Sequence, residues 1–186
     1  MRMNKMQTSR LTLRLLKPGD AEAMETLLQE KDIASTTLGI PHPYPSGAAA
    51  SFIQLRQDAA AKGDGYSFAV LDSASSAFMG VIGLHINKNH NHAELGYWIG
   101  KPYWGYGYCT EAVKGVMDFA FRELKLNRLY AAALTRNPAS YKVMEKSGMK
   151  HEGVFRQHLL KWEVYEDVTH YGLLRSEYEQ IDRLRQ

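Results

Sequence analysis

The sequence predicts an α/β (α+β) domain, built on a mixed and mostly antiparallel sheet of about seven strands with about four helices against it. Three observations predict this fold class. Strand-like stretches follow one another between residues 66 and 99, with short polar turns between them. A strongly amphipathic helix pattern comes next, at residues 112–124. A strand pattern at residues 129–135 then completes a parallel crossover.

Length and composition agree with one domain over residues 1–186. Apolar residues make up 45% and charged residues 23% of the chain, as in ordinary globular proteins, which excludes the disordered class. The net charge of +3 comes without a run of like charges, so nucleic-acid binding is not indicated. The single cysteine, Cys109, cannot form an internal disulfide, which fits a reducing compartment.

The chain shows no sign of a membrane or secretory segment. Its charge-free stretches lack the roughly 20 consecutive apolar residues that a membrane helix needs. Residues 1–10 are basic, but no apolar core follows them, so we expect no signal peptide. Together these observations predict a cytoplasmic protein that does not contact a membrane.

The N-terminal third opens with a strand and continues with two helices. Residues 11–15 alternate apolar and polar side chains, as a half-buried strand does. Asp20 can cap the first helix, which carries apolar residues at 24, 27 and 28. A second helix is expected after Ser46. Between the helices, three prolines within residues 41–45 predict a stiff surface loop.

The later elements follow the same logic. The stretches 66–71, 78–86 and 93–99 predict a three-stranded antiparallel meander. Asn137 before Pro138 predicts a helix start, because asparagine caps and proline suits the first helical position. Residues 154–160 and 168–174 predict a final pair of strands.

A glycine-rich loop joins the third strand of the meander to the amphipathic helix. Gly105 and Gly107 let the backbone N–H groups approach an anion, and the helix N-terminus adds partial positive charge. Thr110 can add a hydroxyl. The loop therefore predicts a phosphate or pyrophosphate site, with a plain tight turn as the alternative. The spacing fits neither a nucleotide-triphosphate loop nor a dinucleotide fingerprint.

These residues carry a resemblance to a known family. The segments AELGYWIGKPYWGYGYCTEA, at residues 93–112, and NPASYKVMEKSGM, at residues 137–149, resemble the acetyl-CoA-binding core of the GNAT superfamily of N-acetyltransferases. More narrowly, they resemble its branch of ribosomal-protein N-terminal acetyltransferases. The resemblance extends over nearly the whole chain and implies the GNAT fold. It also implies acetyl-CoA as cosubstrate and no metal.

The resemblance implies which residues hold acetyl-CoA. The family's pyrophosphate motif places a basic or amide residue, a glycine and a small residue where this chain has Trp104, Gly107 and Cys109. Backbone donors bind the phosphates, so the two departures leave that role intact. The implied cofactor-binding residues are Tyr97, Trp98, Ile99, Trp104, Gly105, Tyr106, Gly107, Tyr108, Cys109, Thr110, Asn137 and Ser140.

Glu94 is the candidate general base. Its position along the strand puts it on one face with Gly96 and Trp98, while Leu95, Tyr97 and Ile99 share the other. The alternative is an exposed or ion-paired strand glutamate. In related transferases an acidic residue near this place acts on the acceptor amine, which the resemblance carries over to Glu94.

Ser140 is the candidate acid. The tyrosine that protonates the thiolate in much of the family is replaced here by Met144, whereas the ribosomal branch has a serine three places after the asparagine. That serine is Ser140, on one side of the first helical turn with Asn137. The alternative is that Asn137 only caps the helix and Ser140 only completes its first turn. Tyr141 points away and is the weaker candidate.

Other chemistry is less favoured. Cys109 has no adjacent histidine, so a packed small residue is favoured over a nucleophile. His85, His90 and His92 lie around a polar turn without the ligand set of a zinc site. The dense aromatic residues between 97 and 108 fit core packing and cofactor contact better than base stacking.

The sequence therefore predicts an acetyl-CoA-dependent N-acetyltransferase that acts by direct attack in a ternary complex. The acceptor expected first is a protein N-terminal α-amine, as in ribosomal proteins. A polyamine, antibiotic or amino acid acceptor is the alternative, as is a non-catalytic acetyl-CoA sensor. Residues 41–45 and 155–162 are expected to wall the acceptor side. The expected assembly is a monomer or homodimer.

Overall fold

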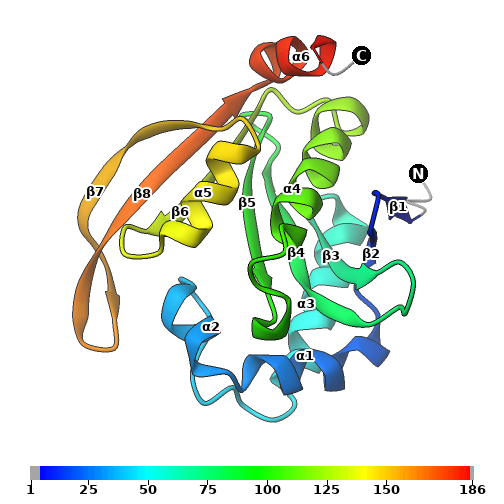
Figure 1. Ribbon diagram of the computed structural model, residues 1–186, viewed down its shortest axis with the longest axis vertical. Coiled ribbons are helices and arrows are strands. Elements are labelled where there is room, and N and C mark those ends of the chain that lie inside the picture. The colour runs from blue at the N-terminus through cyan, green and yellow to red at the C-terminus, as the bar shows by residue number, and fades with distance from the viewer. Residues whose placement is uncertain (1–4, 185–186) are drawn as a thin grey trace.

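The computed structural model describes residues 5–184 of the 186-residue chain (Figure 1). The outer ends of the domain predicted over residues 1–186 lie outside the described residues. Residues 1–4, which belong to the N-terminal stretch where we expect no signal peptide, also lie outside the described residues. Among the helices that the structure describes, none is both long and apolar enough to cross a membrane.

Within residues 5–184, one mixed sheet of eight strands has the order β1-β2-β3-β4-β5-β6-β8-β7. All neighbours are antiparallel except β5 and β6. The strands are β1 (Met6–Gln7), β2 (Leu11–Leu15), β3 (Gly65–Asp72), β4 (Phe78–Asn87), β5 (His92–Ile99), β6 (Arg128–Leu134), β7 (Lys150–Lys161) and β8 (Val164–Leu174). The expected fold class is confirmed. The expected number of about seven strands is one too low, because β1 has only two residues.

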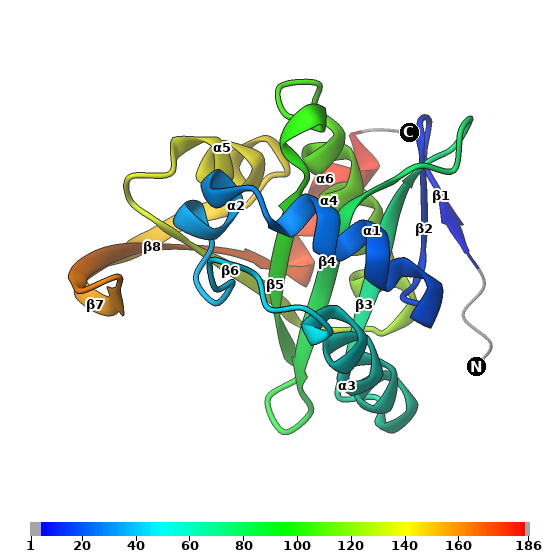
Figure 2. The same ribbon diagram turned by 90° about the horizontal axis from the view of Figure 1, so that it is seen from below.

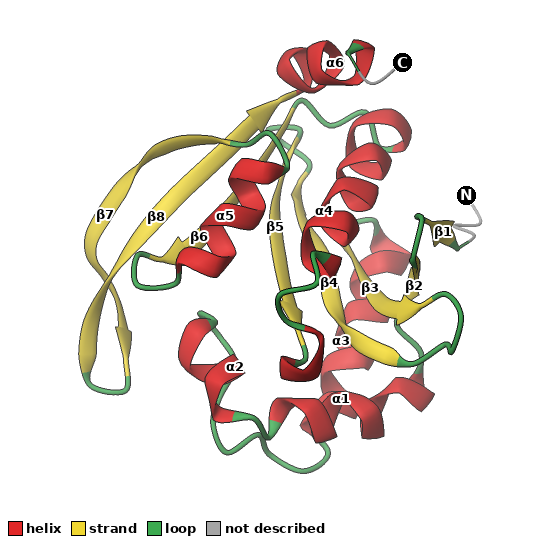
Figure 3. Ribbon diagram, viewed as in Figure 1, coloured by secondary structure: helices red, strands yellow, loops and turns green. Residues whose placement is uncertain are grey.

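In the described part of the chain, six α-helices accompany the sheet, rather than the four or so that the sequence predicts (Figure 3). They are α1 (Ala21–Leu28), α2 (Lys31–Thr36), α3 (Ala48–Lys62), α4 (Tyr108–Asp118), α5 (Pro138–Lys146) and α6 (Arg175–Arg183). The two additional ones are α2 and α6. The first is a six-residue helix too short for a periodic signal, and the second is strongly polar in sequence.

The helices cover both faces of the sheet, with α3 on one side and α4 and α5 on the other (Figure 2). Each face carries its own buried cluster. One cluster packs α4, α5 and α6 against residues such as Leu95 and Ile99 of β5. The other packs α1, α2 and α3 against Trp98 of the same strand. The alternation predicted for β5 is therefore confirmed.

The first helix begins differently from the prediction. Asp20 occupies the position before α1, but its carboxylate makes no capping bond to that helix. It accepts hydrogen bonds from the Arg14 guanidinium, at 2.7 and 2.8 Å, and from the Lys17 backbone N–H at 2.8 Å. Asp20 is buried, and the ion pair satisfies its charge. The side chain therefore ties the 3₁₀ turn at Pro18–Asp20 to β2.

The parallel pairing of β5 and β6 is short. Only His92, Ala93 and Glu94 of β5 lie opposite residues of β6, and the two strands are unpaired beyond Glu94 (Figure 1). A strand's backbone groups point alternately to its two edges, so the rest of β5 presents N–H and C=O groups to a gap in the sheet. This gap positions the candidate site.

Candidate active site

A cleft of about 920 Å³ passes through the region where β5 and β6 separate. Its walls come from both faces of the sheet: from α2, α3 and the loop before α3 on one side, and from α5 and the start of α4 on the other. All the site residues predicted from the sequence line it except Tyr106. They are Glu94, Tyr97, Trp98, Ile99, Trp104, Gly105, Gly107, Tyr108, Cys109, Thr110, Asn137 and Ser140.

The loop before α4 has the backbone of an anion site. Gly107, the N-cap of α4, has a φ of +79°, and Gly105 has a φ of +83°, a region that favours glycine. Among the described residues, no N–H group from Gly105 to Thr110 donates a hydrogen bond. These free donors and the helix N-terminus together favour a bound anion.

Trp104 holds the loop against the end of β5. Its indole Nε1 donates a hydrogen bond of 2.6 Å to the Ile99 carbonyl oxygen. This contact gives a structural reason for an aromatic residue at the first place of the pyrophosphate motif. Tyr106, in contrast, points away from the cleft, and its side chain is largely exposed. Its backbone carbonyl accepts a hydrogen bond from Arg10.

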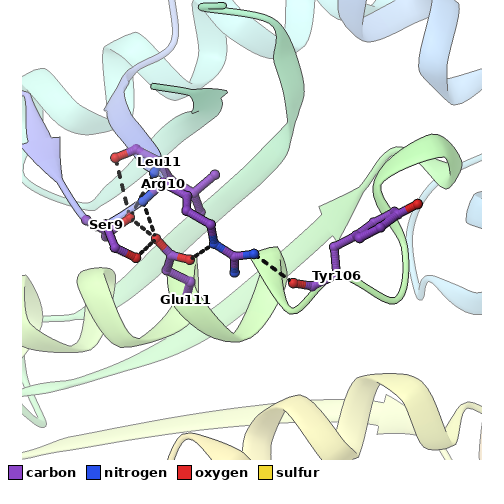
Figure 4. A network of polar contacts seen from close by, with 6 residues as sticks. Ser9, Arg10, Leu11, Tyr106 and Glu111 are labelled. Atoms are coloured by element: carbon purple, nitrogen blue, oxygen red, sulfur yellow. Dashed lines mark hydrogen bonds and ion pairs between the residues drawn. The ribbon is translucent and has the colours of Figure 1, made fainter. Parts of the chain in front are cut away.

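A clamp from the turn between β1 and β2, at residues 8–10, fixes the loop and the first turn of α4 (Figure 4). The Arg10 guanidinium donates to the Tyr106 carbonyl at 3.0 Å and to the Glu111 carboxylate at 2.7 Å. It also lies 4.4 Å from the centre of the Tyr108 ring. The Glu111 carboxylate accepts further hydrogen bonds from Thr8, Ser9 and the Arg10 backbone.

The clamp keeps Glu111 ionised. Burial raises the pKa of this carboxyl, but the hydrogen bonds from Thr8, Arg10 and Ser9 outweigh burial and lower the pKa to about 2. A negative charge in the first turn of a helix is also favourable. Arg10 offsets that charge beside the anion site. The sequence pattern showed no signal for this pairing, because Arg10 and Glu111 lie 101 residues apart.

Tyr97 and Ser140 meet across the cleft. The Tyr97 phenol donates a hydrogen bond of 3.0 Å to the Ser140 carbonyl oxygen, and the Ser140 hydroxyl lies 3.3 Å from the phenol oxygen, to which it donates. Burial raises the pKa of Tyr97, so the phenol stays protonated. The contact ties β5 to the first turn of α5 and fixes the Ser140 side chain at the cleft.

Asn137 caps α5, as the sequence predicts. Its side-chain oxygen accepts a hydrogen bond of 3.3 Å from the Ser140 backbone N–H, and its amide nitrogen donates one of 3.1 Å to the Thr36 carbonyl at the end of α2. Both polar ends of the side chain are engaged in the protein. Asn137 therefore positions Ser140 and links the two sides of the cleft.

Glu94 lies on the face of β5 opposite the anion site. It is directly opposite His85 on β4 and Tyr130 on β6, and its charge helps to raise the pKa of Tyr130 after burial. No ion pair involves Glu94 among the described residues. It is the single carboxylate among the described residues that line the cleft.

Cys109 follows the N-cap of α4 by two residues and packs against the core. Desolvation raises the pKa of its thiol to about 12, so the thiolate is scarce at neutral pH. This environment suits a packed side chain and opposes a nucleophile.

Sequence reasoning missed several residues at the site. Lys142 and Lys146 line the cleft from α5, one helical turn apart, and Arg56 lines it from α3. The sequence did contain a signal for the two lysines: they are four residues apart in the helix that Asn137 caps, so they lie on one face of that helix. Residues 155–162, expected to wall the acceptor side, are absent from the described lining of the cleft. Pro41, within the expected loop, does line it.

The histidines around the turn between β4 and β5 form no cluster with other ligands. The rings of His90 and His92 stack, with centroids 5.9 Å apart. Within residues 5–184, no group of three or more His, Cys, Asp or Glu side chains is placed to hold a metal ion.

Comparison with known proteins agrees with this geometry. Residues 10–150 match the family described as the acetyltransferase (GNAT) domain. The putative ribosomal N-acetyltransferase YdaF of Bacillus subtilis is 33% identical over 91% of this chain and 93% of its own length.

Two solved structures share the fold. A spermidine N-acetyltransferase from Vibrio cholerae, in complex with CoA and spermine, has 26% identity, a TM-score of 0.80 and coverage of 92% of this chain and 99% of its own. A ribosomal L7/L12 α-N-protein acetyltransferase in complex with coenzyme A has a TM-score of 0.86 at 19% identity, with coverage of 92% and 98%. The family match covers well over half of the chain and includes the whole glycine loop. The chain belongs to the acetyltransferase (GNAT) domain family and is an N-acetyltransferase.

Proposed function

We propose that the chain transfers the acetyl group of acetyl-CoA to the N-terminal α-amine of a protein, as a ribosomal-protein acetyltransferase does. The observation that carries the proposal is the placement of Glu94 and Ser140 in one cleft, at the gap between β5 and β6. The relative named as a putative ribosomal N-acetyltransferase supports the acceptor class.

The loop before α4 would hold the pyrophosphate of acetyl-CoA. The free N–H groups from Gly105 to Thr110 are its donors, and Lys142 and Lys146 add positive charge to the same wall. The unpaired edge of β5 from Tyr97 to Ile99 would pair with the amides of the pantetheine arm. These residues lead from the anion site toward Ser140 and the gap.

Glu94 would accept the proton that the acceptor amine must lose. Only a neutral amine can attack the thioester carbonyl, and Glu94 lies free of ion pairs among the described residues. A backbone N–H of Trp98 or Ile99 would stabilise the oxyanion that forms. Holding the two substrates together in the cleft supplies a large part of the rate.

Ser140 would supply the proton that the departing sulfur takes. Attack of the neutral amine on the thioester carbon forms the C–N bond and the oxyanion, with Glu94 taking the amine proton. The C–S bond then breaks as the carbonyl re-forms, the sulfur receives the Ser140 hydroxyl proton, and solvent restores it. Tyr97 keeps that hydroxyl in place and remains protonated. Asn137 holds the backbone of Ser140 from the other side.

An assay of free CoA thiol with acetyl-CoA and a panel of amines tests the proposal. The panel contains peptides with free and with blocked N-termini, polyamines and aminoglycosides, and mass spectrometry locates the acetyl group. We expect acetylation of the free α-amine. Exposed positions away from the cleft supply matched controls, with Glu123→Gln beside Glu94→Gln and Ser176→Ala beside Ser140→Ala. Acetylation restricted to small amines would overturn the protein acceptor.

A polyamine is the alternative acceptor. The observation in its favour is the similarity to the spermidine N-acetyltransferase of Vibrio cholerae, whose structure contains spermine. The same panel separates the two acceptor classes.

A further inference from the structure

Positive charge predominates among the charged side chains that line the cleft. Arg56, Lys142 and Lys146 are cationic, whereas Glu94 is the single carboxylate in the described lining. The two lysines belong to α5, on the anion-site face, and Arg56 belongs to α3, on the face that Glu94 occupies. A polycationic acceptor would therefore meet one carboxylate and a nearby guanidinium.

Arg56 has no anionic partner in the described structure. None of the ion pairs or side-chain hydrogen bonds among residues 5–184 involves its guanidinium, and its Nε atom is buried without a hydrogen-bond acceptor. The guanidinium lies 4.9 Å from the centre of the Phe52 ring, which also lines the cleft. A buried donor without a partner is costly, so an acceptor group that supplies an oxygen anion here gains affinity.

The sheet between Arg56 and Glu94 is open. Ser67 on β3, Gly83 on β4 and Gly96 on β5 lie opposite one another in one row across three strands. A Cβ atom added at Gly96 would meet nothing within 4 Å, so no side chain fills that end of the row. Arg56 and Ser67 also form a wall of a second cavity, of about 660 Å³. A bound molecule can therefore cross the sheet from Glu94 to Arg56.

The distance across this row selects the acceptor. Gly96 lies two residues from Glu94 along β5, about 6.8 Å. Two strand spacings, about 9.6 Å in total, separate Gly96 from Ser67, which lines both cavities with Arg56. The diagonal from Glu94 to Ser67 is therefore about 12 Å, whereas an extended peptide advances about 3.4 Å per residue and an acidic side chain adds to its reach. An amine at Glu94 and a carboxylate at Arg56 thus correspond to the N-terminus of a peptide and an acidic side chain at its second or third residue.

We propose that the acceptor of this enzyme carries a carboxylate within about 12 Å of its reacting amine, and that Arg56 is the residue that selects it. The occupant is an N-terminal peptide segment with Asp or Glu at position two or three. This inference rests on the proposed function and narrows its acceptor class. It favours a peptide over a polyamine, which carries no carboxylate.

Matched peptides test the inference. Three N-terminal peptides that differ only at position three, with Glu, Gln or Lys, are compared by kcat/KM with acetyl-CoA saturating. We expect the Glu peptide to exceed the Gln peptide about tenfold, the effect of one charged hydrogen bond, and the Lys peptide to be the poorest. The same series with the changes at position two locates the carboxylate.

Variants of α3 assign the preference to Arg56. We expect Arg56→Gln to bring the Glu/Gln ratio close to one and Arg56→Lys to retain part of it. Lys114→Gln on α4 removes the same charge at a residue outside the described lining of both cavities and serves as the control, with a ratio like that of the wild type. Thermal unfolding of each variant shows whether it is folded.

Calorimetric binding of the three peptides to the protein with CoA separates the inference from the proposed function. Acetylation of all the peptides at equal rates, or a ratio unchanged in Arg56→Gln, overturns the inference while α-amine acetylation stands. A charge preference in binding without turnover on any peptide supports the inference and contradicts the proposed function. Preference for spermidine over all the peptides overturns both.

Discussion

The Ser140 hydroxyl lies 3.3 Å from the Tyr97 phenol oxygen, and the phenol in turn donates to the Ser140 carbonyl oxygen at 3.0 Å. This pair joins β5 to α5 across the cleft at the level where β5 and β6 have separated. The arrangement holds the serine side chain at the cleft, and burial raises the pKa of Tyr97, so the phenol stays protonated. In the proposed reaction, Ser140 is the proton donor that this contact positions.

The pair predicts non-additive kinetics. Ser140→Ala should lower kcat about 100-fold, since a positioned proton donor contributes at least this much, and Tyr97→Phe should lower it about tenfold by freeing the serine. The double variant should be no slower than Ser140→Ala alone, because Tyr97 acts through Ser140. Steady-state kinetics of the four proteins checks this, and multiplying effects would show that Tyr97 acts independently.

Replacing Glu94 should lower the rate of acetyl transfer without weakening the binding of CoA. Glu94→Gln removes the proton acceptor and keeps the shape of the side chain, so kcat/KM for the amine should fall about 100-fold. Binding of CoA should be unchanged, because Glu94 and the anion loop lie on different faces of β5. Kinetics and calorimetry measure the two effects, with Glu123→Gln as the control. Equal losses in CoA affinity and turnover would contradict the assignment.

Replacing Gly107 should weaken the binding of acetyl-CoA, an effect that backbone strain alone does not produce. Gly107 and Gly47 are both helix N-caps with a φ of +79°, but only Gly107 lines the cleft. Alanine at either position should cost about 1 kcal/mol of stability, since a left-handed backbone disfavours a Cβ. Only Gly107→Ala should raise the KM for acetyl-CoA, by about tenfold, which corresponds to about 1.4 kcal/mol.

Urea unfolding and acetyl-CoA kinetics of the Gly107→Ala and Gly47→Ala proteins provide the measurement. If both variants raise the KM equally, the loop before α4 has no special part in binding the cosubstrate.

Glu111 predicts a stability that depends on pH. Its folded pKa of about 2 lies below the ordinary 4.5, and each pKa unit corresponds to about 1.4 kcal/mol, so the clamp contributes about 3 kcal/mol. Because the folded pKa is lowered, this contribution is fully present above pH 4.5 and is lost as the pH falls toward 2. Urea unfolding should show Glu111→Gln less stable than wild type at pH 7. The difference should shrink by pH 3, and a constant difference would contradict the clamp.

Cys109 predicts an enzyme without an acyl intermediate. A thiol whose pKa is about 12 should react slowly with iodoacetamide in the folded protein at pH 8 and rapidly in urea. Cys109→Ala should keep kcat within about threefold, because direct transfer needs no thiol and alanine is a small side chain that packs in the same place. Intact mass spectrometry after acetyl-CoA alone should show no acetylated protein. An acetyl group on Cys109 would replace direct transfer with a two-step route.

The sequence predicted those parts of the fold whose signals are local. The alternation in β5 and the Asn137 cap of α5 depend on neighbouring residues, and both were found where expected. The loop before α4 was recognisable because Gly105 and Gly107 mark left-handed backbone. Patterns of this kind need no knowledge of distant parts of the chain.

The parts that could not be predicted depend on contacts distant in sequence. The clamp joins Arg10 to Glu111, and Asn137 reaches Thr36 at the end of α2, each across 101 residues. The extent of β5–β6 pairing is likewise fixed by packing on both faces, and no periodicity in either strand reports it. The position of Arg56 in the cleft has no sequence signal, because an arginine on a helix is ordinarily exposed to solvent.

The most direct test of the central claim is a measurement of initial rates in which the concentrations of acetyl-CoA and of an N-terminal peptide are both varied. Mass spectrometry then locates the acetyl group on the product. Direct transfer in one cleft predicts intersecting lines in double-reciprocal plots and an acetyl group on the peptide α-amine. Parallel lines, or acetylation of polyamines with none of any peptide, would contradict the account.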